Sequence, residues 1–296
     1  RRPPRSSLFP YTTLFRSSTT MNILTGFLSA TSGTVRINGH DILEEPQEAK
    51  KCIGYLPENP PLYMDMTAME FLQFVADLKG VERSERSRHL AQIMKMVKIT
   101  DVANRLIKNL SKGYKQRVGI AQAMIGNPEV LILDEPTVGL DPKQIIEIRT
   151  LIKELGKQHT VILSSHILPE VSAVCDRVVI IHRGRIVAVN TTENLSKQYS
   201  KSGKFRLTVE GPTKDILQNL RLIPGVRSAA VTGERVSGSV TIDVENETRD
   251  DIRRQVFFEM ARHSWPIIEM RSMDATLEDI FLKATAGMTD SSEREE

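Results

Sequence analysis

Short, continuous apolar runs alternate with amphipathic stretches over the first two thirds of the chain. The runs at 53–56, 130–133 and 160–163 predict β-strands that are buried on both faces. Apolar residues at helical spacing predict a helix between the last two runs. Its core face is expected to carry Ile145, Ile146, Ile148, Ile152 and Leu155. This alternation predicts an α/β domain whose sheet is covered on both faces.

Other stretches add helices and a hairpin to this domain. Residues 18–28 open with hydroxyl side chains and predict a helix, and 34–39 alternates like a strand. Helical spacing dominates about 65–125 and predicts a helical subdomain. The runs 177–181 and 185–188 flank a short turn and predict a hairpin. The first domain is therefore expected to extend over 18–198.

The pattern changes beyond a polar stretch near 196–204. The remaining residues predict the order strand, helix, strand, strand, helix, strand, with elements at 205–210, 214–222, 226–231, 238–244, 249–263 and 266–271. This order is typical of a small α+β domain of the ferredoxin-like type, expected at 204–286 with a closing helix at 276–285. The polar, acidic tail at 287–296 is expected to be disordered.

Residues 1–17 follow neither a helical nor a strand period. Residues 5–17 resemble translated sequencing-adapter sequence, and a genuine but divergent N-terminus is the alternative. We therefore exclude this segment from the predicted fold. Its four arginines and lack of acids account for the net charge of +3, and the remainder carries about −1. A near-neutral body gives no electrostatic reason to expect binding to nucleic acid.

No apolar run approaches the roughly 18–20 residues that a membrane-spanning helix needs. Any role at a membrane would therefore depend on a partner rather than on direct insertion. Cys52 and Cys175 lack metal-like spacing, which favours a reduced, cytoplasmic setting.

Two adjacent carboxylates, Asp134 and Glu135, directly follow the apolar run at 130–133. Oxygen ligands at the rim of a buried sheet suit Mg²⁺, which Asp134 is expected to hold through its water shell. Glu135 can take a proton from an attacking water, a role worth about 10²–10⁴-fold in rate. His166 follows the run at 160–163 and can face the same rim. Three other histidines that follow no such motif are expected at the surface, namely His159, His182 and His263.

The neighbouring motifs carry a family resemblance. Leu110-Ser111-Lys112-Gly113-Tyr114 resembles the signature loop of ABC transporters, although Lys112 and Tyr114 replace the commoner Gly and Gln. With the carboxylate pair, Gly139-Leu140-Asp141 and His166 in the same order, residues 18–198 resemble an ABC transporter ATP-binding subunit. This implies a P-loop NTPase core with a helical subdomain.

The resemblance implies roles for specific residues. Ser111, Lys112 and Gly113 would bind the γ-phosphate of a nucleotide held by a second subunit, because a helix N-terminus favours anions. Asp141 would relay between the two sites of the dimer, and His166 would contact the γ-phosphate. ATP and Mg²⁺ are the implied cofactors, sandwiched between two copies of the chain.

Three further positions complete the implied nucleotide site. Ser18 would be a Mg²⁺ ligand together with Asp134, and Thr19 would lie beside the nucleotide. Glu58 stands where the family usually has Gln in a loop that contacts Mg²⁺ and the membrane partner. It retains an oxygen ligand and adds a charge.

The phosphate-binding loop is not recognisable. The spacing G-x-x-x-x-G-K-[ST] ending at Ser18 puts Tyr11 and Arg16 at the glycine positions and Ser17 at the lysine position. Bulky side chains prevent backbone N–H groups from converging on phosphate, and no lysine neutralises its charge. We therefore expect a chain truncated at its N-terminus that binds ATP poorly and hydrolyses it negligibly.

The segment 273–283 is similar to the C-terminal ending of multidrug-type and gliding-motility-type ABC exporter subunits, although a plain amphipathic closing helix fits it too. The resemblance implies an ABC-2-type permease as partner, and a peripheral location on the cytoplasmic face of the membrane. A soluble ABC ATPase acting on nucleic acid or ribosomes, and a non-enzymatic regulator, are the alternatives. Specificity for cargo would belong to the permease.

Overall fold

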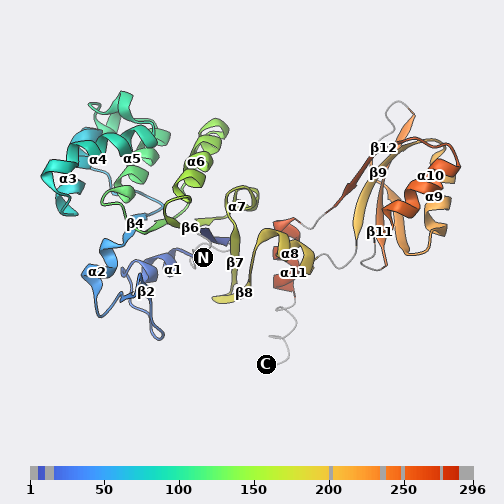
Figure 1. Ribbon diagram of the computed structural model, residues 1–296, viewed down its shortest axis with the longest axis horizontal. Coiled ribbons are helices and arrows are strands. Elements are labelled where there is room, and N and C mark those ends of the chain that lie inside the picture. Colours follow the sequence, from blue (N-terminus) through green and yellow to red (C-terminus); the bar gives the residue numbers. More distant parts are fainter. Residues whose placement is uncertain are drawn as a thin grey trace. The chain divides into compact units, whose positions relative to one another are not determined.

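The computed structural model describes residues 6–10, 17–199, 203–233, 238–247, 251–273 and 276–286. Its internal contacts divide the chain into two compact units, Arg1–Thr192 and Glu193–Glu296. Figure 1 labels the elements of both. The predicted disordered tail at 287–296 lies outside the described residues.

A six-stranded sheet forms the centre of the first unit. The strand order is β4-β5-β6-β1-β7-β8, with bounds Ile53–Leu56, Val130–Leu133, Thr160–Ser165, Ser6–Pro10, Arg177–His182 and Arg185–Asn190. All neighbours are parallel except β7 and β8, which form an antiparallel pair. The predicted strands at 53–56, 130–133 and 160–163 and the predicted hairpin are therefore confirmed.

Strand β1 corrects the sequence analysis, which found no strand period within 1–17. Its residues Ser6–Pro10 pair in parallel with Val161–Ser165 on β6, and two of them also pair with β7. A strand in the interior of a parallel sheet has both faces covered, so it needs no polar–apolar alternation. Without β1, the facing edges of β6 and β7 would lack backbone partners in this sheet.

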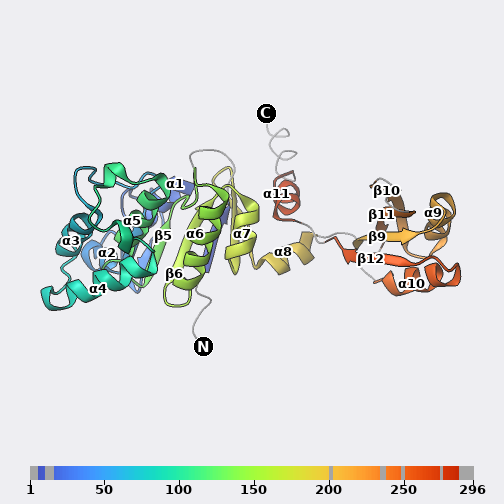
Figure 2. The same ribbon diagram turned by 90° about the horizontal axis from the view of Figure 1, so that it is seen from above.

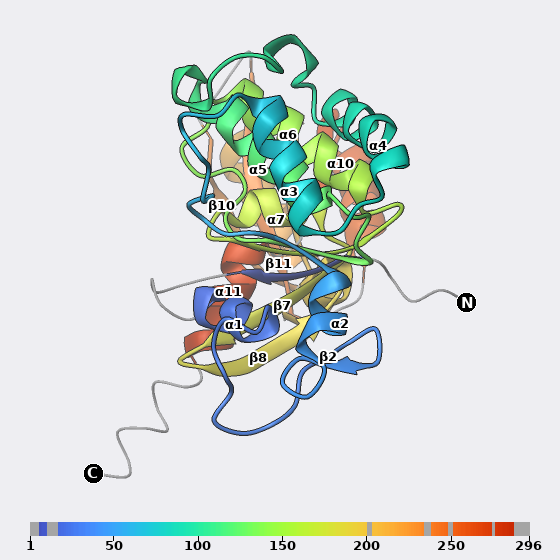
Figure 3. The same cartoon turned by 90° about the vertical axis from the view of Figure 1, so that its left-hand side faces the viewer.

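Helices cover both faces of this sheet, as predicted. In Figure 3, α5, α6 and α7 lie on one side of it and α1 lies on the other. The helices of the first unit are α1 Ser17–Leu24, α2 Pro46–Lys51, α3 Ala68–Leu78, α4 Arg83–Met96, α5 Lys112–Met124, α6 Pro142–Leu155 and α7 Leu168–Val174. Met21 of α1 is fully buried against Ile53 of β4 and Ile132 of β5.

The helical subdomain consists of α3, α4 and α5 with two short 3-10 helices, Thr100–Val102 and Ile107–Asn109. Thr67 begins α3 with a capping box, because its hydroxyl accepts from the Glu70 N–H while the Glu70 carboxylate accepts from the Thr67 N–H. α3 then buries Phe71 and Leu72. Capping and an apolar face thus explain the helical pattern predicted here.

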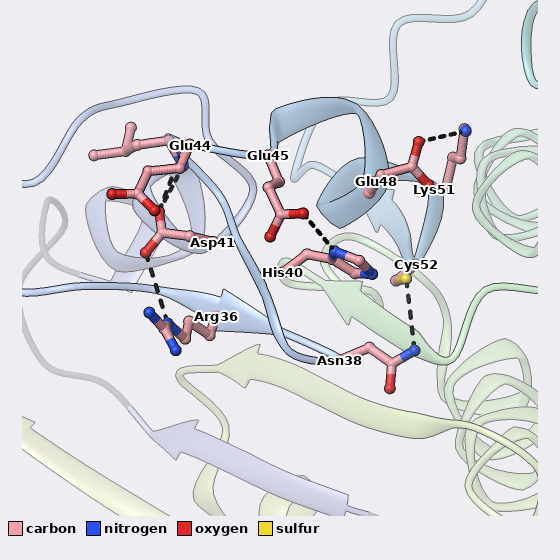
Figure 4. Close-up of polar contacts among 10 residues, drawn as sticks. Arg36, Asn38, His40, Asp41, Glu44, Glu45, Glu48, Lys51 and Cys52 are labelled. Carbon is pink, nitrogen blue, oxygen red and sulfur yellow. Dashed lines mark hydrogen bonds and ion pairs between the residues drawn. The ribbon is translucent and has the colours of Figure 1, made fainter.

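A small hairpin precedes α2, and it is shorter than the strand predicted at 34–39. β2 is Arg36–Ile37 and β3 is His40–Asp41, because Asn38 and Gly39 between them both have positive φ and turn the chain. Asp41 then accepts hydrogen bonds from the backbone N–H groups of Leu43 and Glu44 (Figure 4). These contacts direct the chain from β3 into α2.

The second unit confirms the predicted ferredoxin-like order. Its antiparallel sheet runs β10-β11-β9-β12, with bounds Val226–Val231, Ser239–Asn246, Lys204–Glu210 and Ile267–Ser272. Helices α9 (Thr213–Leu222) and α10 (Arg253–Arg262) pack against this sheet (Figure 2). The unit also contains most of α8 (Thr192–Tyr199) and all of α11 (Leu277–Ala286).

One face of this second sheet is apolar and the other is polar. Phe205, Leu207 and Val209 alternate along β9 and are buried in the core. On the other face, Arg206 forms a bidentate ion pair with Asp243 of β11, with nitrogen–oxygen distances of 2.6 and 2.9 Å. The charges on this face are thus matched across strands.

Three side chains differ from their predicted positions. Ile146 was expected on the core face of its helix, but it is 62% exposed, because two steps of about 100° place it nearly opposite the buried Ile148 around the helix axis. His159 was expected at the surface but is buried, and its Nδ1 lies 2.7 Å from the carbonyl oxygen of Pro128. His182, also expected at the surface, is half-buried at the end of β7.

The close packing of α5 on β4 yields a stability prediction. A Cβ atom at Gly54 would lie 2.1 Å from the Ala123 carbonyl oxygen, so Gly54→Ala should destabilise the protein by about 1–3 kcal/mol. Gly156→Ala is the matched control, because its Cβ would meet nothing nearer than 3.5 Å and its φ of −61° suits alanine. Urea unfolding followed by circular dichroism would measure both, and equal midpoints would contradict the prediction.

Candidate active site

The candidate site lies where β5 and β6 end side by side. Asp134 and Glu135 follow β5, and both are buried, with 3% and 9% exposure. Ser164, the next-to-last residue of β6, joins them. Its hydroxyl donates to Asp134 Oδ1 at 2.5 Å and accepts from the Glu135 N–H at 2.9 Å. One fully buried hydroxyl therefore fixes both predicted acids relative to the neighbouring strand.

Glu135 adopts a backbone conformation that few side chains favour. Its φ is +48°, in the left-handed region, where a residue without glycine's freedom is strained. The N–H bond to Ser164 holds it there. This conformation ends the strand and lets the Glu135 carboxylate face His166.

His166 follows β6 and meets Glu135, as expected from two parallel strands whose carboxyl ends share one edge. Its Nδ1 lies 2.9 Å from Glu135 Oε2. The His166 side chain is 56% exposed while that of Glu135 is 11% exposed. The imidazole thus forms the solvent-facing side of the pair.

Burial raises the pKa of Glu135, and the nearby carboxylates of Asp134 and Glu58 raise it further. The hydrogen bond and charge of His166 oppose this shift. A raised pKa makes the carboxylate a better proton acceptor, which suits a general base. Tyr55 lies nearby, and burial together with the charge of Asp134 raises its pKa to about 12.

Tyr55 also connects this edge to α1. Its hydroxyl donates to the side-chain oxygen of Asn22 at 3.3 Å. Ser18 and Thr19 lie in the first turn of the same helix, with Ser18 partly exposed and Thr19 exposed. Glu58, in the loop after β4, is exposed and close enough to Glu135 to influence its pKa.

The signature residues lie at the N-terminus of α5. Ser111 is the N-cap, and its hydroxyl accepts from the Tyr114 N–H at 3.4 Å. The Tyr114 hydroxyl donates to Asp101 Oδ2 at 2.7 Å. The buried Arg117 donates to the Val97 carbonyl and forms an ion pair with Glu147 of α6. The N-terminal part of α5 is therefore held by the segment 97–101 on one side and by α6 on the other.

The loop ending at Asp141 lies against this first turn. Asp141 caps α6 by accepting from the Gln144 N–H at 2.9 Å. A Cβ atom at Gly113 would come within 2.6 Å of the Gln144 side chain, and one at Gly139 would lie 1.9 Å from Lys112 Nζ. The structure thus gathers the predicted residues into two sets, one around Asp134, Glu135 and His166, the other around Ser111, Lys112, Gly113 and Asp141.

A buried network that no sequence pattern indicated lies beneath the loop that joins these sets. The Thr137 hydroxyl donates to Glu170 Oε2 at 2.6 Å, and Arg149 Nη2 lies 3.0 Å from Glu170 Oε1. Glu170 is only 5% exposed and belongs to α7, directly beyond His166. It therefore ties the loop after Glu135 to the segment after His166. Ser164 could have been found from the sequence, because Ser164 and Ser165 directly precede His166 at the end of an apolar run. Nothing in the local pattern indicated Glu170.

The arrangement fits the chemistry of a magnesium nucleotide. Asp134 and Glu58 offer hard oxygen atoms, and Mg²⁺ takes one or two carboxylates while phosphate and water complete its shell. In the described ranges, no group of three or more His, Cys, Asp or Glu side chains is placed to hold a metal ion. Glu135 and His166 are positioned to activate a water and to contact a developing negative charge.

A covered, mostly parallel α/β sheet of this kind defines a class of α/β proteins that bind their ligands at the carboxyl ends of the strands, where the two acids and the histidine lie. Comparisons with known proteins narrow the class. The family model of the ABC transporter matches residues 17–138. The chain belongs to the ATP-binding proteins of ABC transporters, a family of ATPases.

Two curated relatives from Bacillus subtilis (strain 168) illustrate this membership. The linearmycin resistance ATP-binding protein LnrL is 30% identical over 269 residues, covering 90% of this chain and 85% of that protein. The uncharacterized ABC transporter ATP-binding protein YxlF is 37% identical over 193 residues, covering 65% of this chain and 63% of that protein.

A solved structure described as the ATP-binding subunit of an ABC transporter aligns with a TM-score of 0.61 at 29% identity. The alignment covers 67% of this chain and 82% of the other. The predicted P-loop NTPase core is thereby confirmed. Among the described residues, no helix is both long and apolar enough to cross a membrane.

The raised pKa of Glu135 yields a prediction for stability against pH. Folding favours the protonated form of the Glu135 carboxyl, because its pKa is higher in the folded protein than in the unfolded chain. The stability that protonation adds is fully present below the pKa of the unfolded chain, about 4.3, and is lost as the pH rises through the pKa of the folded protein. At pH 7, Glu135→Gln should therefore raise the free energy of unfolding by about 0.5–2 kcal/mol and unfold at a higher temperature than the wild type. The difference in stability between the two proteins should become smaller toward pH 4.

Calorimetric unfolding from pH 4 to 8 would measure this difference. Glu154→Gln is the control, because Glu154 is exposed and pairs with Lys157 within one helix turn. A Glu135→Gln protein that is less stable than the wild type at every pH would contradict the prediction.

Proposed function

We propose that this chain is the nucleotide-hydrolysing subunit of an ABC-2-type exporter and acts as a homodimer with ATP held between its two copies. The observation that carries the proposal is the pairing of Glu135 with His166 at the ends of adjacent strands, 2.9 Å apart. The separate set around Ser111 and Asp141 supports the dimer, because it can face the nucleotide of a second copy.

Each residue then has a defined role. Asp134, Ser18 and Glu58 hold Mg²⁺ on the phosphates, and Thr19 contacts the nucleotide beside Ser18. Glu135 accepts the proton of the attacking water while His166 contacts the γ-phosphate. Ser111, Lys112 and Gly113 of the second copy bind the same phosphate through a hydroxyl, an ammonium group and helix N–H groups. Asp141 links the two sites.

We further propose that the chain with this sequence turns over little ATP. Tyr11, Arg16 and Ser17 stand where a phosphate loop has two glycines and a lysine. The carboxylates, histidine and signature remain, so the catalytic groups lack the loop that would hold their substrate in place.

The partner that fits this subunit is an ABC-2-type permease at the cytoplasmic face of the membrane. The ending at 273–283 supports this choice, and the relative LnrL bears a name that refers to linearmycin resistance. The loop after β4, which contains Glu58, Pro60 and Pro61, is the proposed contact, because its prolines restrict its conformation.

A soluble ABC ATPase acting on nucleic acid or ribosomes is the second candidate. Against it, the polar sheet face of the second unit carries matched pairs such as Arg206–Asp243 and Lys204–Glu245 rather than an excess of cations. Affinity purification separates the two: co-purification of a permease supports the exporter, and retention on RNA or DNA at moderate salt supports the alternative.

Restoring the phosphate loop tests the proposed chemistry. The purified chain should hydrolyse ATP no faster than its Glu135→Gln variant. A triple variant, Tyr11→Gly with Arg16→Gly and Ser17→Lys, should gain turnover that Glu135→Gln then reduces by about 10²-fold or more. A phosphate-release assay at saturating Mg²⁺ would measure all four proteins. Robust turnover by the unaltered chain that Glu135→Gln abolishes would overturn the claim of inactivity.

A further inference from the structure

The outer side of β12 is an open strand edge of the second unit. The sheet runs β10-β11-β9-β12, so β12 pairs with β9 on one side, and on its other side the described residues give it no strand partner (Figure 2). Such an edge presents backbone N–H and C=O groups that can pair with another chain. A bulge at Ile268 interrupts the pairing with β9, so the regular part of β12 extends from Glu269 to Ser272.

Two residues of this regular part direct their backbone groups to the open edge. The N–H of Met273, directly after β12, donates to the Lys204 carbonyl of β9 at 2.7 Å. Backbone groups of successive residues in a strand face alternate sides, so Arg271 also faces β9. Met270 and Ser272 therefore direct their N–H and C=O groups away from β9, where a further strand could bind them.

The charges of β12 are self-complementary about Met270. Glu269 and Arg271 lie opposite Thr208 and Arg206 of β9, which places both on the polar face of the sheet. A second β12, antiparallel to the first and centred on Met270, would place each Glu269 opposite the Arg271 of the other copy. Two equivalent ion pairs would then join the copies, as a two-fold contact requires.

These two side chains have room for such a contact. Arg271 Nε lies 3.6 Å from Glu269 Oε1 in one chain, yet the side chains are still 60% and 49% exposed. The opposite edge of the sheet lacks the pattern, because Arg227 is the one charged residue in β10. A two-fold pairing of β10 would therefore match no opposite charges.

Apolar side chains are exposed on the elements beside the same edge. Phe257 and Phe258 of α10 are 53% and 57% exposed, and Ile268 at the bulge is 58% exposed. α10 packs against β12, and a pocket of about 270 Å³ where β12 begins is lined by Phe257, Trp265 and Ile267. A second copy would remove part of this apolar surface from water.

We propose that the second unit binds a second copy of this chain through β12, in an antiparallel pairing centred on Met270. The two sheets would become one continuous sheet across a two-fold axis, with α10 of each copy beside the junction. This contact needs no nucleotide. It therefore goes beyond the proposed function, in which ATP joins the two copies, and it holds them together when ATP is absent.

Charge variants of the full chain test the pairing without nucleotide. Sedimentation velocity should show a dimer for the unaltered chain. Glu269→Arg makes the edge positive and Arg271→Glu makes it negative, so each variant alone should raise its dissociation constant about tenfold or more. An equimolar mixture of the two variants should restore dimers, because a positive edge then meets a negative one.

Native mass spectrometry of the mixture identifies the heterodimer, whose mass differs from that of either homodimer. Restored association in the mixture cannot arise from an effect within one chain. Lys214→Glu is the matched control and should leave the dimer unchanged, because Lys214 is exposed on α9, which packs against β10 at the opposite edge.

Hydrogen exchange supplies a second readout that needs no variant. In the unaltered chain, the amide of Met270 should exchange more slowly as the protein concentration rises through the dissociation constant, because this N–H becomes bonded in the dimer. Exchange that is independent of concentration in a chain that dimerises would place the contact elsewhere and overturn the inference.

Two other results would also overturn it. One is a chain that sediments as a monomer without nucleotide, and the other is a dimer that both charge variants form as readily as the unaltered chain. Each of these results leaves the proposed function standing, since ATP turnover and co-purification of a permease test that function separately.

Discussion

The hydroxyl of Ser164 is the contact on which the geometry of the site depends. It binds the carboxylate of Asp134 and the backbone of Glu135 at once, from the neighbouring strand and without exposure to solvent. Because a buried donor or acceptor is costly when unpaired, these bonds make one arrangement of the two strand ends strongly preferred. His166 follows Ser164 by two residues, so the same contact also sets the distance between the histidine and Glu135.

That preference comes with strain and desolvation. Glu135 is held at a positive φ, and its burial, with a smaller effect from the carboxylates of Asp134 and Glu58, raises its pKa. A sequence selected for stability alone would avoid each of these features, and their coincidence at one residue is typical of a functional site. The buried Glu170 offsets part of the cost by tying the loop after Glu135 to α7 and α6.

The strands of the first sheet and the site at their ends could be predicted from the sequence wherever a local pattern carries the information. Apolar runs located β4, β5 and β6, and the parallel arrangement then brought Asp134, Glu135 and His166 to one edge. Long-range contacts were not predictable in this way. Glu170 and His159 are buried because of partners some thirty residues away, Thr137 and Pro128, that no periodicity reveals. The roles proposed for Asp134, Glu135 and His166 remain predictions, as do those proposed for Ser18, Thr19, Glu58, Asp141 and the signature residues.

Strand β1 has a consequence for how the first unit is assembled. The ribosome makes Ser6–Pro10 long before the β6 and β7 segments that flank it in the sheet. The strand therefore cannot pair until β6 and β7 have been made, and its insertion between them closes the longest loop of the sheet. Contacts of such high sequence separation form slowly, because the entropy of closing a long loop is lost before the contacts can stabilise the structure. In a nascent chain, the sheet interior would thus be completed last, by a strand that is synthesised before both of its partners.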